Sequence, residues 1–123
     1  MAKEAHILYI EDERATFDLV NQALKPLGYR VVRANSGQQG LTMMKKQKPD
    51  LLLLDLMMPD VNGWDVYRAV KTDETLADIP VIVITARLSD YDRTVIADLP
   101  QADGYIVKPF DVEQIVQIVQ NFV

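Results

Sequence analysis

Hydrophobic residues occur along the chain in two patterns that alternate from beginning to end. Short, almost wholly apolar runs are typical of strands buried on both faces of a parallel sheet. Longer segments with an apolar residue at every third or fourth position are typical of amphipathic helices. The runs that predict strands are residues 5–10, 29–33, 51–55, 79–85 and 103–107. The segments that predict helices are residues 13–27, 35–48, a stretch after Gly63, 89–99, and a last helix capped by Asp111.

This alternation predicts an α/β fold. Strands and helices alternate five times and no hairpin turn joins two strands, which calls for a parallel sheet with helices on both faces. Right-handed crossovers and five strands favour the flavodoxin-like strand order 2-1-3-4-5. We therefore expect a three-layer, doubly wound (βα)5 fold in which residues 1–123 form one domain, with no second domain attached.

The first and last helices each carry an apolar stripe that we expect to face the sheet. The stripe of the first helix ends at Leu27, and Gly28 looks like the residue that stops the helix. The stripe of the last helix ends at Phe122. Ile118 falls outside that stripe, which predicts an additional exposed apolar residue. Such a residue can mark a partner surface, although single ones are also ordinary.

Polar residues follow four of the five predicted strands. The leucines at residues 51–54 lead directly into Asp55, so a buried strand would hold this carboxylate at the carboxyl edge of the sheet. That edge is where ligands bind in open α/β sheets, and all parallel strands end there. The polar residues at the strand ends are Glu11 and Asp12 after the first strand, and Asp55, Thr85 and Lys108 at the third, fourth and fifth.

Three carboxylates, one hydroxyl and one ammonium group are thus expected in a single crevice. Carboxylates this close repel one another, and Mg²⁺ relieves the repulsion because it prefers oxygen ligands. The formal charges then sum to zero, with −3 from the carboxylates, +2 from the metal and +1 from Lys108. A phosphoryl group arriving at Asp55 would meet a metal ion, an ammonium group and a hydroxyl donor. Asp55 is therefore a candidate nucleophile that forms an aspartyl-phosphate.

Each of these residues also has a simpler interpretation. Glu11 and Asp12 suit the beginning of a helix, where the helix dipole favours negative charge. Asp55 could merely end a strand or cap the next helix. Thr85 could end a β-branched strand, and Lys108 could be a solvated strand terminus. The coincidence of four such strand ends is what favours the functional interpretation.

The composition narrows the class of partner. A net charge of −5 argues against a surface that binds nucleic acid directly, which would normally be basic, but leaves a protein partner open. The chain has no cysteine, so it forms no disulfide and uses no thiolate chemistry. No apolar run approaches the roughly 18 residues of a membrane span, and the first residues do not form a signal peptide. We expect a cytoplasmic protein without membrane insertion.

Four motifs in combination resemble the receiver domain of response regulators in two-component signalling. They are YIEDE after the first strand, LLLLDLMMPDVNG around the third, VIVITA at the fourth and GYIVKPF at the fifth. The resemblance covers essentially the whole chain. It implies that Asp55 is the phosphoacceptor and that Mg²⁺ is bound by Asp12 and Asp55 directly, by Glu11 through water and by the backbone carbonyl of Met57. The acidic pair is Glu-Asp in place of Asp-Asp, which slightly lengthens the reach of the first carboxylate.

The resemblance also implies a switch and a set of partners. Thr85 would hydrogen-bond the phosphoryl group, Lys108 would pair with it, and Tyr105 would occupy the aromatic switch position. The phosphoryl donor would be a phosphohistidine of a sensor histidine kinase or of a histidine phosphotransfer protein. The chain would be a stand-alone response regulator that signals to a downstream protein. It would not be an enzyme beyond self-phosphorylation and slow autodephosphorylation.

Three other classes of function stay open from the residues themselves. A flavodoxin-like binding module for a phosphorylated cofactor would need a Ser/Thr/Gly-rich loop after the first strand, where this chain has EDERAT. A metal-dependent phosphatase would need an acid two residues after Asp55, where this chain has Met57. A purely structural interaction domain would not bind Mg²⁺ at the acidic crevice.

Overall fold

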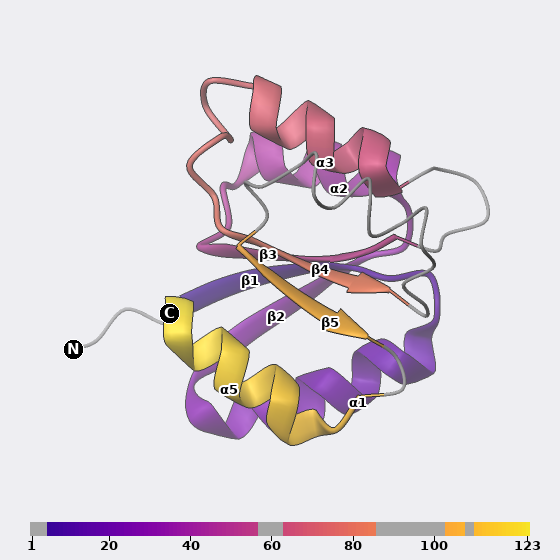
Figure 1. Ribbon diagram of the computed structural model, residues 1–123, viewed down its shortest axis with the longest axis vertical. Helices are drawn as coiled ribbons and strands as arrows, with labels where there is room; N and C mark the ends of the chain where they lie inside the picture. The colour runs from indigo at the N-terminus through magenta and orange to yellow at the C-terminus, as the bar shows by residue number, and fades with distance from the viewer. Residues whose placement is uncertain (1–4, 57–62, 86–102, 108–109) are drawn as a thin grey trace.

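The computed structural model describes residues 5–56, 63–85, 103–107 and 110–123, which form a three-layer α/β structure (Figure 1). The central layer is a five-stranded parallel sheet with the order β2-β1-β3-β4-β5, which confirms the predicted order. The strands are β1 (Ala5–Ile10), β2 (Tyr29–Ala34), β3 (Leu51–Asp55), β4 (Val81–Thr85) and β5 (Gly104–Val107).

Helices cover both faces of this sheet. In the described part of the chain, α1 (Arg14–Leu24) and α5 (Val112–Phe122) lie on one face, and α2 (Gly37–Lys46) and α3 (Gly63–Thr72) lie on the other (Figure 1). The helix predicted at residues 89–99 lies outside the described residues. Right-handed crossovers on alternate faces explain this arrangement, because the chain moves from β1 toward one edge of the sheet and later back past β1 toward the other.

Two apolar clusters fill the space between the layers. Leu8 and Leu52 belong to the cluster beneath α2 and α3, whereas Tyr9 and Leu53 belong to the cluster beneath α1 and α5. Successive side chains of β1 and β3 therefore alternate between the two faces, and both faces are buried. This explains why these strands are continuous apolar runs in the sequence, and it makes the ends of β1 and β3 rigid.

The helix ends follow the predicted signals. Ser36 is the N-cap of α2, and its Oγ accepts a hydrogen bond from the backbone N–H of Gln39 at 3.1 Å. A single 3-10 turn, η1 (Lys25–Leu27), follows α1. Gly28 then ends it with a φ of 92°, a left-handed conformation that favours glycine. Asp111 caps α5 in a capping box with Gln114.

The expectations for three apolar residues near the helix ends are wrong. Leu27 lies in the 3-10 turn after α1 and is 50% exposed, because the tighter turn rotates it off the stripe that faces the sheet. Phe122 lies in the last turn of α5 and is 36% exposed. Ile118 is partly buried and packs against the cluster beneath α1 and α5, so it does not offer the exposed partner surface considered above. The missing side chain of Gly104 leaves the space that Ile118 occupies.

β4 begins two residues later than the apolar run suggests. Ile79 is buried, but its N–H donates to the carbonyl of Leu76 at 3.0 Å, so it belongs to the turn after α3. The strand begins at Val81, whose N–H donates to a carboxylate oxygen of Asp103 at 2.7 Å. The hydrophobicity of a residue indicates whether it is buried, whereas its backbone hydrogen bonds determine whether it belongs to a strand.

Gly63 begins α3 and lies against the end of β3. A Cβ atom at Gly63 would lie 2.5 Å from the Cα of Leu56 and 3.0 Å from the carbonyl oxygen of Asp55. Both neighbours are backbone atoms, which cannot move aside as a flexible side chain can. Gly63 therefore permits the close approach between α3 and the segment that carries Asp55.

We predict that Gly63→Ala lowers the free energy of unfolding by about 1–3 kcal/mol, because the added methyl group overpacks this contact. In an open site the same change within a helix stabilises by up to about 1 kcal/mol, so the sign of the effect is diagnostic. Urea denaturation measures it. Unchanged or increased stability would contradict the close approach described here.

Candidate functional site

Asp55 is the last residue of β3, and its carboxylate lies at the carboxyl edge of the sheet. Every residue of β3 is buried, and Asp55 itself is only 1% exposed. It pairs in register with Ile84 of β4, and the next N–H, of Leu56, donates to the Ile84 carbonyl at 2.9 Å. On the other side, the preceding Leu54 pairs with Ile10 of β1, so Asp55 has little freedom to move away.

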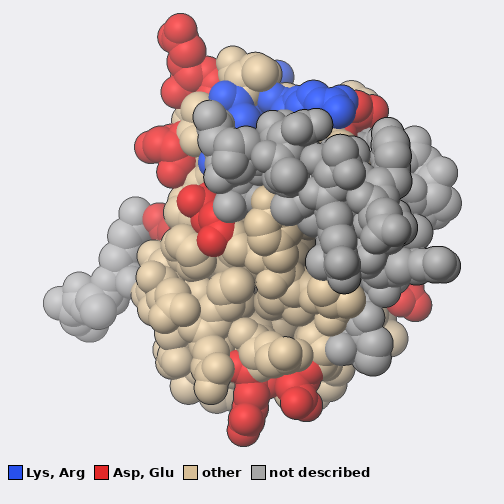
Figure 2. Space-filling model, viewed as in Figure 1, with Lys and Arg blue, Asp and Glu red and all other residues tan. Residues whose placement is uncertain are grey.

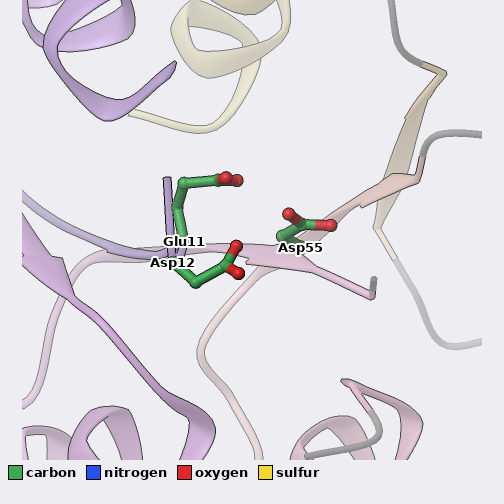
Figure 3. Close-up of side chains that lie close together, drawn as sticks. All are labelled: Glu11, Asp12 and Asp55. Carbon is green, nitrogen blue, oxygen red and sulfur yellow. The ribbon is translucent and has the colours of Figure 1, made fainter. Parts of the chain in front are cut away.

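Glu11 and Asp12 directly follow β1, the neighbouring strand. Glu11 continues the ladder with β2 because its N–H donates to the carbonyl of Ala34 at 3.0 Å, and the residue is fully buried. One carboxylate oxygen each from Glu11, Asp12 and Asp55 can be chosen so that all three lie within 4.8 Å of one another. Figure 3 shows the three carboxylates gathered around one small space. We call these three residues the acidic cluster.

The acidic cluster lies at the switch point of the sheet, as the strand order predicts. From β1 the chain crosses by α1 to β2, whereas β3 is followed by α3 on the opposite face. Because α1 and α3 lie on opposite faces of the sheet, the carboxyl ends of β1 and β3 meet where ligands bind in open α/β sheets. The structure brings together all three acidic residues that the sequence placed there.

The donor atoms of this cluster fit a hard divalent cation. All three groups are carboxylates, and two of the three residues are buried. Solvent screens the repulsion between like charges least in a buried site. Mg²⁺ takes oxygen ligands, often one or two carboxylates with several waters, and Asp12 is the most accessible of the three. The cluster is therefore compatible with Mg²⁺ and with chemistry on a phosphoryl group beside it.

Glu11 also has a structural role at the beginning of a helix, as its simpler interpretation in the sequence analysis predicts. Its Oε1 accepts a hydrogen bond from the backbone N–H of Glu13 at 3.2 Å, immediately before α1 begins. Glu13 is the N-cap of α1 and provides no side-chain cap of its own. A carboxylate has four acceptor positions on its two oxygens, so this bond fixes Glu11 and still leaves acceptors for the cluster.

Arg33 supports the acidic loop, and the sequence analysis did not identify it. Its Nε donates to the carbonyl of Glu11 at 3.0 Å and its Nη2 donates to the carbonyl of Asp12 at 2.8 Å. The guanidinium group thus holds the backbone of both residues and adds a positive charge beside them. The signal available in the sequence was the parallel register, which places the end of β2 beside the end of β1.

The structure describes the remaining predicted site residues in part. Thr85 ends β4 and pairs in register with Val107 of β5. Tyr105 lies on β5 opposite Val83, is partly buried against the cluster beneath α2 and α3, and has a pKa raised by that burial. Met57 and Lys108 lie outside the described residues, so their roles stay predictions.

Burial and nearby carboxylates change the pKa of the Tyr9 phenol on β1. Burial raises the pKa of Tyr9 well above its usual range, and the negative charges of Glu11 and Asp55 raise it further. The phenol therefore stays protonated and keeps a hydrogen to donate.

Charge elsewhere on the molecule is spread unevenly. On the face shown in Figure 2, Asp and Glu side chains project at several separate places, and Lys and Arg side chains gather in one band at the end where α2 and α3 lie. Among the described helices, none combines the length and the hydropathy that a membrane span requires.

We predict that Arg33→Ala lowers the free energy of unfolding by about 1–3 kcal/mol, because two carbonyl groups lose a charged donor. Arg30→Ala is the matched control, since Arg30 is an exposed arginine on the same strand, and it should change stability by less than about 0.5 kcal/mol. Urea denaturation of both variants makes the comparison. Equal effects of the two substitutions would contradict the supporting role of Arg33.

The fold and the acidic cluster together define a class of protein: a doubly wound α/β domain with a carboxylate pocket at its switch point. A family model described as the response regulator receiver domain matches residues 7–120. The chain therefore belongs to the receiver domains of two-component response regulators.

Curated relatives agree with this family. The chain is 43% identical over 108 residues to the DNA-binding dual master transcriptional regulator RpaA of Synechocystis, an alignment that covers 88% of this chain and 44% of the relative. It is 36% identical to the phosphate regulon transcriptional regulatory protein PhoB of Pseudomonas aeruginosa, with coverage of 89% and 48%. The chain thus spans about half the length of the curated relatives it matches.

Solved structures resemble the whole chain. The chemotaxis protein CheY4 of Vibrio cholerae superimposes with a TM-score of 0.88 at 25% identity, covering 98% of this chain and 100% of that one. The receiver domain of the sensor histidine kinase PA1611 of Pseudomonas aeruginosa gives a TM-score of 0.84 at 27% identity, with 98% of each chain covered. That structure has a magnesium ion coordinated in its active-site cleft.

Proposed function

We propose that the Asp55 carboxylate of this receiver domain accepts a phosphoryl group from a phosphohistidine, with Mg²⁺ bound at the acidic cluster. The donor is a sensor histidine kinase or a histidine phosphotransfer protein. The observation that carries the proposal is the convergence of Glu11, Asp12 and Asp55, whose chosen carboxylate oxygens lie within 4.8 Å of one another. Membership of the receiver family supports it.

The phosphoryl transfer follows from the chemistry of the residues. An oxygen of Asp55 attacks phosphorus, the bond from phosphorus to the histidine nitrogen breaks, and the electron pair leaves with that nitrogen. As the family resemblance implies, Asp12 and Asp55 would hold Mg²⁺ directly, Glu11 would hold it through water, and the carbonyl of Met57 would complete the protein ligands. When bound, the metal ion offsets the negative charge of the carboxylates and of the transferring group.

Lys108 and Thr85, which belong to the family motifs at the ends of β5 and β4, are the further residues that we propose to contact the phosphoryl group. The ammonium group of Lys108 pairs with a phosphoryl oxygen, and the Thr85 hydroxyl donates a hydrogen bond to another. Movement of Thr85 toward the phosphoryl group opens space that the ring of Tyr105 fills. The domain thus has two conformers, one before and one after these movements of Thr85 and Tyr105. They differ in their contacts to the phosphoryl group, so phosphorylation shifts the population between them.

The output of this switch is a contact with another protein surface. The net charge of −5 does not favour direct binding of nucleic acid by residues 1–123, which we treat as one receiver unit. The DNA-binding activity in the name of RpaA belongs to that relative, which is more than twice as long as the matched part. The receiver unit is a cytoplasmic signalling domain that carries one phosphoryl group and hydrolyses it slowly.

We predict that incubation with a small phosphodonor and Mg²⁺ adds one phosphoryl group to the chain, and that Asp55→Asn abolishes the addition because the amide is not a nucleophile. Intact-mass spectrometry counts the phosphates. Asp65→Asn is the matched control, since Asp65 is an exposed aspartate on α3 whose carboxylate pairs with Arg68; this variant should be phosphorylated like the wild type.

Two outcomes would overturn the assignment of Asp55. One is phosphorylation of Asp55→Asn to the same stoichiometry as the wild type. The other is continuous turnover of phosphomonoesters by the wild type, which would instead indicate a phosphatase. Removal of Mg²⁺ with a chelator should reduce the addition to background, and unchanged labelling would remove the metal from the mechanism.

A further inference from the structure

Tyr9 is buried in the middle of the sheet and carries a polar atom that the core does not explain. Its side chain is 0% exposed, and its hydroxyl has no hydrogen-bond partner within ordinary geometry among the described residues. Buried hydroxyl groups are nearly always hydrogen-bonded, so an exception calls for a physical reason. A phenylalanine would fill the same apolar space without this requirement.

The strand geometry places Tyr9 beside the acidic cluster. Glu11 continues the ladder with β2 one residue past β1, and side chains alternate along an extended chain, so Tyr9 and Glu11 project on the same face of the sheet. Tyr9 pairs in register with Leu53, which lies two residues before Asp55 on β3. Burial raises the pKa of Tyr9 most, and among charged groups Glu11 and then Asp55 raise it further, as expected for carboxylates near the phenol.

The ring of Tyr9 is held in place from the helix side. It packs against the ring of Phe17 of α1, with centroids 6.2 Å apart and planes tilted by 47°. Tyr9 also belongs to the apolar cluster beneath α1 and α5. With the ring fixed by these contacts, the hydroxyl has few directions in which it can find an acceptor, and Glu11 is the nearest residue along the chain on the same face that carries one.

We propose that Tyr9 is a positioning residue for the metal site: its hydroxyl donates a hydrogen bond to the Glu11 carboxylate and orients that carboxylate for Mg²⁺. The inference rests on the proposed function. One oxygen of Glu11 accepts from the N–H of Glu13, and the phenol is a second donor that fixes the carboxylate. Outer groups that orient metal ligands typically change metal affinity by about 10–100-fold when they are removed.

Tyr67 provides a matched control within the same chain. Its hydroxyl is also buried without a hydrogen-bond partner in the described part of the structure, and its side chain is 2% exposed. It lies on α3, in the apolar cluster on the opposite face of the sheet. Its ring contacts Trp64 edge-on at 6.0 Å, and the group that most raises its pKa after burial is Tyr105, not a carboxylate of the acidic cluster.

We predict that Tyr9→Phe weakens Mg²⁺ binding about tenfold, the lower end of that range because Glu11 holds the ion through water, and that Tyr67→Phe changes it less than about twofold. Isothermal titration calorimetry of the full chain with MgCl₂ gives the dissociation constants, and it avoids a fluorescence readout that Tyr67 would disturb through Trp64. Thermal unfolding without Mg²⁺ shows whether each variant is folded, so that loss of structure is separated from loss of orientation.

A double-mutant cycle with Glu11→Gln identifies the group through which Tyr9 acts. The inference predicts that Tyr9→Phe has much less effect on Mg²⁺ affinity once Glu11 is replaced. It is overturned if Tyr9→Phe binds Mg²⁺ like the wild type, if both tyrosine variants weaken binding equally, or if the effect persists undiminished in the Glu11→Gln background. A wild-type chain that binds no Mg²⁺ overturns the proposed function as well, which distinguishes the two failures.

Discussion

Electrostatic repulsion among three carboxylates is the constraint on which the architecture of this domain depends. Two ionised carboxylates about 5 Å apart repel by roughly 3 kcal/mol at the effective dielectric constant of a protein. The chain nevertheless gathers Glu11, Asp12 and Asp55 within that range, and it buries two of the three residues. A flexible loop would relieve the repulsion by moving apart. Here the carboxylates follow β1 and β3, adjacent strands held in register within the sheet, so they cannot separate without breaking the fold.

Several contacts act together to maintain this arrangement. Arg33 holds the carbonyls of Glu11 and Asp12, and the N–H of Glu13 holds one oxygen of Glu11. Gly63 lets α3 approach the backbone that follows Asp55. These groups restrain the backbone and one side-chain oxygen, but they leave carboxylate oxygens directed at a common point. A site of this kind is already organised for a divalent cation, and the binding of the cation does not have to supply the ordering.

Much of this could be predicted from the sequence because the relevant signals are local or topological. The apolar runs identify the strands, and the rule that parallel strands end at one edge brings Glu11 and Asp55 together. The contribution of Arg33 could not be predicted in the same way, because its importance lies in two hydrogen bonds to backbone carbonyls more than 20 residues away in the chain. The role of Tyr9 could not be predicted either, because hydrophobicity describes its ring and says nothing of its hydroxyl.

The sequence-based predictions are wrong at positions where a residue's hydrophobicity and its backbone hydrogen bonds indicate different structures. Ile79 is as buried as a strand residue but bonds within a turn, so β4 begins at Val81. Leu27 is apolar but lies in a 3-10 turn that rotates it toward solvent. In both cases local backbone hydrogen bonds set the geometry, and hydrophobicity does not report them.

The most direct test of the central claim is the dependence of folding stability on Mg²⁺ concentration, measured by urea denaturation at constant ionic strength. If one Mg²⁺ ion binds the folded acidic cluster, the free energy of unfolding rises with the logarithm of the Mg²⁺ concentration. Above the dissociation constant it should gain about 1.4 kcal/mol for each tenfold increase. Asp12→Asn should flatten this dependence. A wild-type chain whose stability does not respond to Mg²⁺, or responds as strongly after Asp12→Asn, would contradict the account.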